Sequence, residues 1–301
     1  MSSAICVIVN PHAGGTGTSD RGTEVREALA EAGVEAEIRP MAPGRSPEDA
    51  AREALAAAFD TIVAAGGDGT VSGVANAVLH AGGGARLGLL PFGTFNFFAR
   101  GLSLPLDPAG AAACLRDGAT RGVAVGTVNG RVFLNNMSLG LYPSILDNRE
   151  DVYARWGRSR AAAYWSVLTT LTGMHRPMRL TLDTDGTRER MVTPLVFVAA
   201  SAYQLDAYSL QGADAVREGR LALFAARKAR AADLVRSAVA LARGRAREGE
   251  EFDMRTGRAF EIHPHKARVL VARDGEREHM ATPLRVAFSE RPIEVIVPRP
   301  A

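Results

Sequence analysis

The junction AAGGDGTVSG, residues 64–73, constrains the fold of this chain more than any other stretch. An apolar run from Thr61 to Ala65 has the character of a buried strand and leads directly into three glycines, Gly66, Gly67 and Gly69. Apolar side chains at helical spacing follow, at Val71, Val74, Ala75, Val78 and Leu79. Glycines between a strand and a helix permit a sharp turn and let a ligand approach the backbone N–H groups. The junction therefore predicts a strand–loop–helix unit of an α/β sheet.

The same alternation of strand and helix extends through the N-terminal half. Ser46 as N-cap and Pro47 at the first helical position form a typical helix start. Short apolar strands linked by helices are typical of a doubly wound parallel sheet, so we assign residues 1–121 to an α/β domain. Its strands are predicted at residues 4–9, 35–39, 61–65 and 86–90, and its helices at about residues 22–32, 46–58 and 70–82.

From about Gly122 the pattern becomes mostly that of β-strands. Residues 122–128 and 131–138 are expected to pair around an Asn129-Gly130 turn. We predict that residues 122–301 form a second, mostly β domain; whether its last strands return to the first domain stays open. Further strands are expected at residues 179–183, 194–200, 220–225, 259–263, 268–272, 284–287 and 293–297, and helices near 151–174 and 229–247.

The composition narrows the chemistry. A net charge of +3 suits contact with phosphate or anionic lipid, and no dense block of basic residues marks either end, which disfavours nucleic acid as a partner. Lysine occurs only at Lys228 and Lys266, so no P-loop is present and phosphate binding would need backbone N–H groups, arginine or a metal ion. Cys6 and Cys114 are too few for a disulfide framework. Without a signal-peptide pattern or a long apolar run, we expect a cytoplasmic protein.

Polar, glycine-bearing loops follow three of the predicted strands. Residues 10–15 follow the first strand, residues 66–70 the third, and residues 91–96 the fourth. The carboxyl ends of parallel strands share one edge of a sheet, where α/β proteins bind ligands. The next helix presents its positive end there, which favours phosphate, and Asp68 then suits Mg²⁺ or a ligand hydroxyl. The alternative interpretation is a tight turn capped by Asp68 and Thr70.

Taken together, these motifs resemble a known family. Asn-Pro-x-x-Gly near the start, Gly-Gly-Asp-Gly-Thr, and LPFGTFNFFARGLSLP at residues 90–105 have the order and rough spacing of the diacylglycerol kinase catalytic domain. Asp274-Gly275-Glu276 resembles that family's late Asp-Gly-Glu, and residues 217–226 resemble its Asp-Asp-Gly strand start. The chain thus resembles bacterial lipid kinases of the diacylglycerol and sphingosine kinase family over nearly its whole length. Gly-Gly-Asp-Gly alone is shared with NAD kinases and phosphofructokinases.

The resemblance implies an NAD kinase-like α/β domain that binds the nucleotide, a β-sandwich domain, and an active site between them. It implies ATP as phosphate donor, Mg²⁺, and a lipid hydroxyl as acceptor, with diacylglycerol as the default lipid. Glu276 would be the general base, and Asp68 would also act in catalysis. A second Mg²⁺ would be held around Ala215, Glu218 and Arg220, with carbonyls from the outer two. The implied nucleotide contacts are Asn10, Gly66, Gly67, Asp68, Gly69, Thr70, Val71, Ser72, Gly93, Thr94 and Asn96.

The chain departs from the family pattern at several polar positions. Ser72-Gly73 stands where the family often has Asn-Glu, Phe97 where it often has Asp, and Ala124 where Val-Asp-hydrophobic-Gly is frequent. These exchanges favour either a subgroup with a different lipid acceptor or a weakened Mg²⁺ network. Two alternative functions therefore stay open: an NAD kinase-like enzyme, and a lipid-binding or regulatory protein that has lost activity.

Contact with a membrane is a further expectation. Tyr153, Trp156, Tyr164 and Trp165 lie among arginines, as is common at a membrane interface. A basic stretch at residues 227–247 suits anionic headgroups, at an inner membrane face for a cytoplasmic protein. Each stretch is otherwise an ordinary solvated helix face. The phenylalanines Phe95, Phe97 and Phe98 suit either core packing, which we favour, or an acyl pocket. A homodimer is also an open option.

Overall fold

The computed structural model divides the chain into two compact units. The first unit comprises Met1–Val125 with Ser289–Ala301, and the second unit comprises Gly126–Phe288. The residues that the structure describes are 4–11, 21–82, 84–140, 177–227 and 252–299. The following predicted features lie outside them: the loop residues 12–15, the helix near 151–174 with its aromatic and arginine side chains, and residues 228–247 of the basic stretch.

The first unit is built on a six-stranded sheet. Its strands, in spatial order, are β2 (Glu37–Pro40), β1 (Ile5–Val9), β3 (Thr61–Gly66), β4 (Arg86–Pro91), β18 (Ile293–Val297) and β5 (Ala119–Val123). Every neighbouring pair is parallel except β18 with β5, which is antiparallel. The predicted doubly wound parallel sheet is therefore confirmed, with an antiparallel edge strand added.

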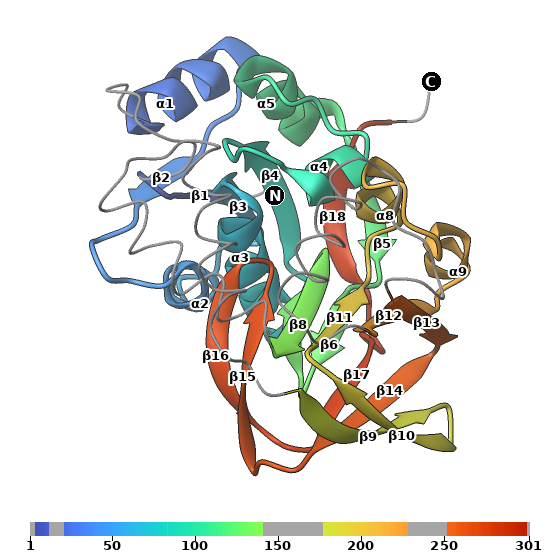
Figure 1. Cartoon of the computed structure of the whole chain (residues 1–301). Coiled ribbons are helices and arrows are strands. Elements are labelled where there is room, and N and C mark those ends of the chain that lie inside the picture. Colours follow the sequence, from blue (N-terminus) through green and yellow to red (C-terminus); the bar gives the residue numbers. More distant parts are fainter. Residues whose placement is uncertain (1–3, 12–20, 83, 141–176, 228–251, 300–301) are drawn as a thin grey trace, which may run out of the picture. The chain divides into compact units, whose positions relative to one another are not determined.

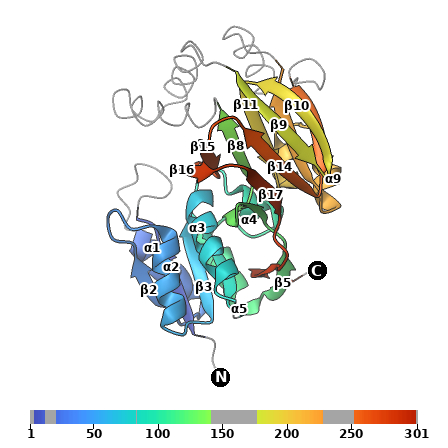
Figure 2. The ribbon, with the colours of Figure 1, turned by 90° about the horizontal axis from the view of Figure 1, so that it is seen from below.

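Helices pack against this sheet in two pairs (Figures 1 and 2). One pair is α1 (Arg21–Ala32) with α5 (Pro108–Asp117), and the other is α2 (Pro47–Ala56) with α3 (Asp68–His80). Every residue of β3 is buried, as expected for a strand whose two faces are both covered.

The second helix begins as its sequence predicts. Ser46 is the N-cap residue of α2, its side chain accepts a hydrogen bond from the Asp49 N–H at 3.0 Å, and Pro47 is the first helical residue. Helix α5 begins in the same way, with Asp107 accepting from the Gly110 N–H at 2.6 Å.

The second unit is a sandwich of two six-stranded antiparallel sheets. One sheet is β10 (Thr187–Thr193), β9 (Met178–Thr184), β14 (Ala259–Pro264), β17 (Leu284–Phe288), β6 (Gly126–Val128) and β7 (Arg131–Phe133). The other is β13 (Phe252–Gly257), β12 (Leu221–Ala226), β11 (Leu195–Ala199), β8 (Asn136–Gly140), β15 (Arg268–Arg273) and β16 (Glu276–Ala281). One apolar core joins the sheets, with Phe133 and Phe260 from the first and Met137 and Leu139 from the second. The predicted β-sandwich is confirmed.

Two short helices pack on the second sheet of the sandwich. They are α8 (Ala202–Ala207) and α9 (Ala213–Arg217). A separate apolar cluster joins them to the sheet, with Leu205 and Val216 against Ala222 and Phe224. In the described residues, no helix is long and apolar enough to cross a membrane.

The structure corrects some predicted boundaries. The predicted strand 122–128 is two strands, because β5 ends at Val123 in the first unit and β6 begins at Gly126 in the second. The predicted strand 131–138 is also two, since β7 and β8 belong to different sheets. The Asn129-Gly130 turn does join β6 and β7, with both residues at positive φ. The late strand, β18, lies between β4 and β5 in the sheet of the first unit.

Candidate functional site

The residues that directly follow β1, β3 and β4 meet at one edge of the first unit's sheet. Strands β1, β3 and β4 are neighbours in parallel register, so the residues that follow each of them lie side by side. The Asn10 N–H donates to the Ala65 carbonyl, and the Asn10 side-chain amide donates to Thr70 Oγ1, both at 3.0 Å. Asn10 thereby connects the end of β1 to the first turn of α3. This is the carboxyl edge of the sheet, where the sequence predicts ligand binding.

Packing alone requires glycine at Gly66, at the end of β3. A Cβ atom on Gly66 would lie 2.5 Å from Thr70 Oγ1, so no side chain fits there. Gly67 is the N-cap residue of α3 and brings no side-chain acceptor to the first-turn N–H groups. Phosphate oxygens suit the N-terminal end of a helix, because its N–H groups point outward and the helix dipole adds to the attraction.

Asp68 is the first residue of α3, and its side chain is half-buried. One carboxylate oxygen accepts a hydrogen bond from the Phe98 N–H at 3.3 Å, which joins α3 to α4 (Phe97–Gly101). A carboxylate in the first turn is favoured by the helix dipole. The cap residue of α3 is Gly67, and Thr70 Oγ1 accepts from Asn10; the alternative of a purely structural turn at Asp68 and Thr70 stays open.

The loop after β4 is shaped by Asn96. This residue is 7% exposed and has a left-handed backbone, with φ 50° and ψ 42°. Its Oδ1 accepts from the Gly93 N–H at 2.9 Å, and its Nδ2 donates to the Gly93 carbonyl at 2.8 Å. The side chain thus holds the loop's own backbone, whereas Thr94 on the same loop is exposed. Of the two, Thr94 is the better placed to contact a nucleotide.

Val71 and Ser72 are two further implied nucleotide contacts with buried side chains, as Thr70 and Asn96 also are. Val71 is 6% exposed and Ser72 is 4% exposed. The Val71 N–H donates to the Gly67 carbonyl at 3.0 Å, the first hydrogen bond of α3. A contact from either residue to a ligand would therefore have to come through the backbone. Gly69, between Asp68 and Thr70, is half-buried.

In the second unit, Asp274-Gly275-Glu276 forms the turn between β15 and β16. Asp274 and Gly275 both have positive φ, at 46° and 93°. The Asp274 carboxylate accepts hydrogen bonds from three consecutive backbone N–H groups at 2.6, 2.8 and 3.2 Å, those of Leu134, Asn135 and Asn136. The hairpin turn is thus tied to the chain between β7 and β8. Glu276 is the first residue of β16, exposed, and opposite Arg273 in the register.

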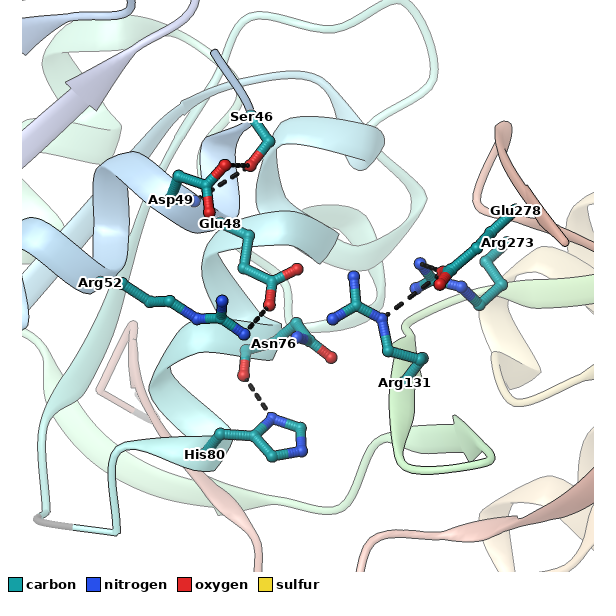
Figure 3. A network of polar contacts seen from close by, with 9 residues as sticks. All are labelled: Ser46, Glu48, Asp49, Arg52, Asn76, His80, Arg131, Arg273 and Glu278. Atoms are coloured by element: carbon teal, nitrogen blue, oxygen red, sulfur yellow. Dashed lines mark hydrogen bonds and ion pairs between the residues drawn. The ribbon is translucent and has the colours of Figure 1, made fainter. Parts of the chain in front are cut away.

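A group of charged side chains lies on the strands around this turn (Figure 3). Arg273 is 8% exposed and donates to the Val132 carbonyl at 2.5 Å and to Glu278 at 3.1 Å. Arg131 also pairs with Glu278, at 3.5 Å. Sequence reasoning missed this group and the role of Asp274, because strand pairing brings together residues about 140 positions apart.

The predicted second metal site falls at the C-terminal turn of α9. The Arg220 N–H donates to the Ala215 carbonyl at 2.9 Å, and the Gly219 N–H to Val216 at 3.0 Å, which closes the helix with Gly219 at φ 78°. Glu218 is 66% exposed and pairs with the Arg220 guanidinium at 3.2 Å. The described residues contain no group of three or more His, Cys, Asp or Glu side chains suited to a metal. Carboxylate and carbonyl oxygens are the ligands that Mg²⁺ prefers, and the C-terminal end of a helix also attracts a cation. The Arg220 guanidinium, however, already pairs with the Glu218 carboxylate.

Two family models match the chain. The diacylglycerol kinase catalytic domain matches residues 4–128. The YegS C-terminal NAD kinase beta sandwich-like domain matches residues 146–297, half of the chain. The first match contains Asn10, Asp68 and Thr94, and the second contains Glu218 and Glu276.

Individual relatives agree with these matches. "Probable lipid kinase YegS-like" of Pseudomonas aeruginosa (strain UCBPP-PA14) is 43% identical over 153 residues, 50% of this chain and 49% of that protein. "Diacylglycerol kinase" of Bacillus subtilis (strain 168) is 35% identical over 130 residues, 43% of each chain. The chain therefore matches about half or less of the length of these relatives. The crystal structure of a diacylglycerol kinase from Bacillus anthracis str. Sterne has the same fold, with a TM-score of 0.70, 22% identity, and coverage of 98% of this chain and 97% of that one.

Proposed function

We propose that this chain, which belongs to the diacylglycerol kinase family of bacterial lipid kinases, transfers the γ-phosphate of ATP to the hydroxyl group of a diacylglycerol-like lipid. The observation that supports this most is the meeting of the residues that directly follow β1, β3 and β4 within the matched catalytic domain. They present glycine backbone, the start of a helix and one carboxylate at a single edge.

In this proposal the nucleotide phosphates bind at the start of α3. The first-turn N–H groups after Gly67 and the exposed hydroxyl of Thr94 would donate to phosphate oxygens. No lysine lies in the first unit, so backbone N–H groups would bind the phosphates that a lysine binds in P-loop proteins. Asn10 and Asn96 would act by holding the loops in shape.

Glu276 would accept the proton of the lipid hydroxyl. As that proton leaves, the lipid oxygen forms a bond to the γ-phosphorus, and the bond from the γ-phosphorus to the bridging oxygen of ADP breaks. An exposed carboxylate on a short, anchored hairpin suits a base that must meet an incoming hydroxyl.

Mg²⁺ is part of the proposal. When bound, the ion would neutralise phosphate charge, and the residues that fit it by chemistry are Asp68 beside the nucleotide loop and Glu218 with the carbonyls of Ala215 and Arg220. Glu218→Gln should raise the Mg²⁺ concentration needed for half-maximal activity. An unchanged requirement would remove Glu218 from the metal site.

The test is to incubate the protein with labelled ATP and either diacylglycerol, NAD or a total lipid extract, and to identify products by mass spectrometry. We expect label on lipid, and its loss in Asp68→Asn and Glu276→Gln. Glu290→Gln, at another exposed carboxylate, serves as the matched control and should stay active. Label only on NAD would favour the NAD kinase alternative. No label on any acceptor would favour a lipid-binding or regulatory protein.

A lipid acceptor also implies contact with a membrane surface, and we propose peripheral binding at the inner membrane face. The homodimer stays a prediction, which sedimentation of the purified protein can test.

A further inference from the structure

One aromatic side chain is conspicuously exposed beside the nucleotide loops. Phe95 is 52% exposed, and within the described part of the first unit no other large apolar side chain is exposed to this degree. Its ring stacks on that of Phe97, with centroids 5.4 Å apart and ring planes 6° from parallel. Phe98, by contrast, is 8% exposed. The expectation of core packing thus fits Phe98, while Phe95 is an exposed ring stacked on the half-buried ring of Phe97.

Hydrogen bonds within the loop accompany the exposed position of Phe95. Asn96 stands between the two phenylalanines in the sequence, and both polar ends of its side chain are bound to loop backbone. Arg100 Nε donates to the Phe95 carbonyl at 2.9 Å, which brings a guanidinium to the same surface. An aromatic ring half in water is stabilised when an apolar partner covers it, so this position on the loop favours such a partner.

We propose that the Phe95–Phe97 pair is the surface by which this protein docks onto an anionic lipid bilayer. Aromatic rings beside a guanidinium match a bilayer interface, where rings enter the acyl boundary and arginine meets anionic headgroups. The pair also adjoins Thr94 and the Phe98 N–H that binds Asp68. A bilayer docked here brings its lipids to the edge at which the nucleotide would bind. This inference rests on the proposed function, because it assigns the lipid side of the same reaction.

The competing occupant is the adenine base, which could also stack on an exposed ring. A bilayer fits better because Arg100, bound to the Phe95 carbonyl, brings a positive charge to the exposed ring, where anionic headgroups would meet it.

The test is flotation of the full chain with vesicles, without ATP and without acceptor lipid, so that binding is measured apart from catalysis. Vesicles of phosphatidylcholine with about 30% phosphatidylglycerol are compared with phosphatidylcholine alone. Phe95→Ser should weaken binding to the anionic vesicles about tenfold, as expected for removing one ring from an apolar phase. Val192→Ser is the matched control, because Val192 is a 61% exposed apolar residue of the second unit, and it should bind like wild type.

A second variant reports the insertion directly. Phe95→Trp should keep binding, and its emission, after subtraction of the wild-type spectrum, should shift to shorter wavelength when anionic vesicles are added. Unchanged flotation of Phe95→Ser would overturn the proposal. If that variant also bound ATP more weakly, the Phe95 ring would instead be a contact of the adenine base. Phe95-dependent flotation in a protein that phosphorylates no lipid would refute the proposed function and leave the docking surface standing.

Discussion

Gly93 lies so close to Gly67 that a Cβ atom on Gly93 would be 2.5 Å from the Gly67 Cα. The reverse approach is also tight, since a Cβ on Gly67 would lie 3.1 Å from the Gly93 Cα. The two residues belong to the loops after β4 and β3, and their contact brings the two loops together at the sheet edge. The same Cβ on Gly93 would lie 2.5 Å from Asn96 Oδ1, the atom that holds the loop.

Gly93→Ala should therefore separate the two loops and weaken nucleotide binding. Overpacking of this kind costs about 1–3 kcal/mol of folding free energy. We expect a lower melting temperature and an ATP affinity reduced at least about tenfold, since loop separation moves the groups that would hold phosphate. Thermal unfolding and calorimetric titration with ATP measure the two effects.

The control for this variant is Gly82→Ala. Gly82 has φ 67° and open space around the missing side chain, so the substitution carries backbone strain but no overlap. It should cost about 1 kcal/mol and leave ATP affinity unchanged. Equal loss of ATP affinity in both variants would mean that general destabilisation, not the loop contact, explains the effect.

Asp274→Asn should reduce activity by releasing the hairpin that carries Glu276. The asparagine keeps one acceptor oxygen and places an NH₂ group against backbone N–H donors, so at least one of the three hydrogen bonds is lost. We expect a loss of about 1–3 kcal/mol in unfolding free energy and a lower kcat with little change in the KM for ATP.

The chain supplies a close control in Asp185. It also precedes a glycine in a hairpin turn, has φ 49°, and accepts two backbone N–H groups, those of Arg258 and Ala259. Asp185→Asn should lose similar stability and keep its kcat. If kcat falls equally in both variants, Asp274 has no special part in positioning Glu276.

Local signals predicted the first unit well because its elements are set by neighbouring residues. Ser46-Pro47 marks the start of α2, and apolar runs mark β1, β3 and β4. Asp107-Pro108 is the same kind of signal, and applying it would have predicted α5. The Asp185-Gly186 turn likewise marks the hairpin of β9 and β10, which sequence reasoning saw only in part.

What escaped prediction depends on pairing between distant segments. Nothing near Ile293 indicates that β18 lies between β4 and β5, because parallel pairing leaves no turn to recognise. The triple hydrogen bond of Asp274 is equally hidden, since an Asp-Gly pair predicts only a hairpin turn. For the site, sequence motifs identify which residues meet at the edge but not that Asn96 is used by its own loop.

The departure at Gly73 has a packing reason that only the structure reveals. A Cβ there would lie 2.9 Å from Pro47 Cβ and 3.3 Å from the Glu48 nitrogen, so glycine allows α3 to approach the start of α2 closely. Gly73→Glu, which introduces the residue the family often has, should therefore destabilise the protein by about 1–3 kcal/mol and not raise activity. Urea unfolding and the lipid phosphorylation assay test this, with Gly73→Ala as the smaller step. A more active and equally stable Gly73→Glu variant would show that the exchange weakened catalysis instead.

The buried thiol of Cys6 predicts a loss of stability at alkaline pH. Cys6 is 0% exposed in β1, and its burial raises the pKa of the thiol to about 11 from 9.0, against a smaller lowering by Arg39. Above pH 9 the unfolded chain releases this proton while the folded chain keeps it. The stability that the neutral buried thiol contributes is therefore fully present below pH 9 and is lost as the pH rises toward 11. Over that window the free energy of unfolding should fall by about 2–3 kcal/mol. Urea unfolding at several pH values, compared with Cys6→Ala, measures it, because the variant lacks this slope. Curves that decline in parallel would show that other groups cause the alkaline loss.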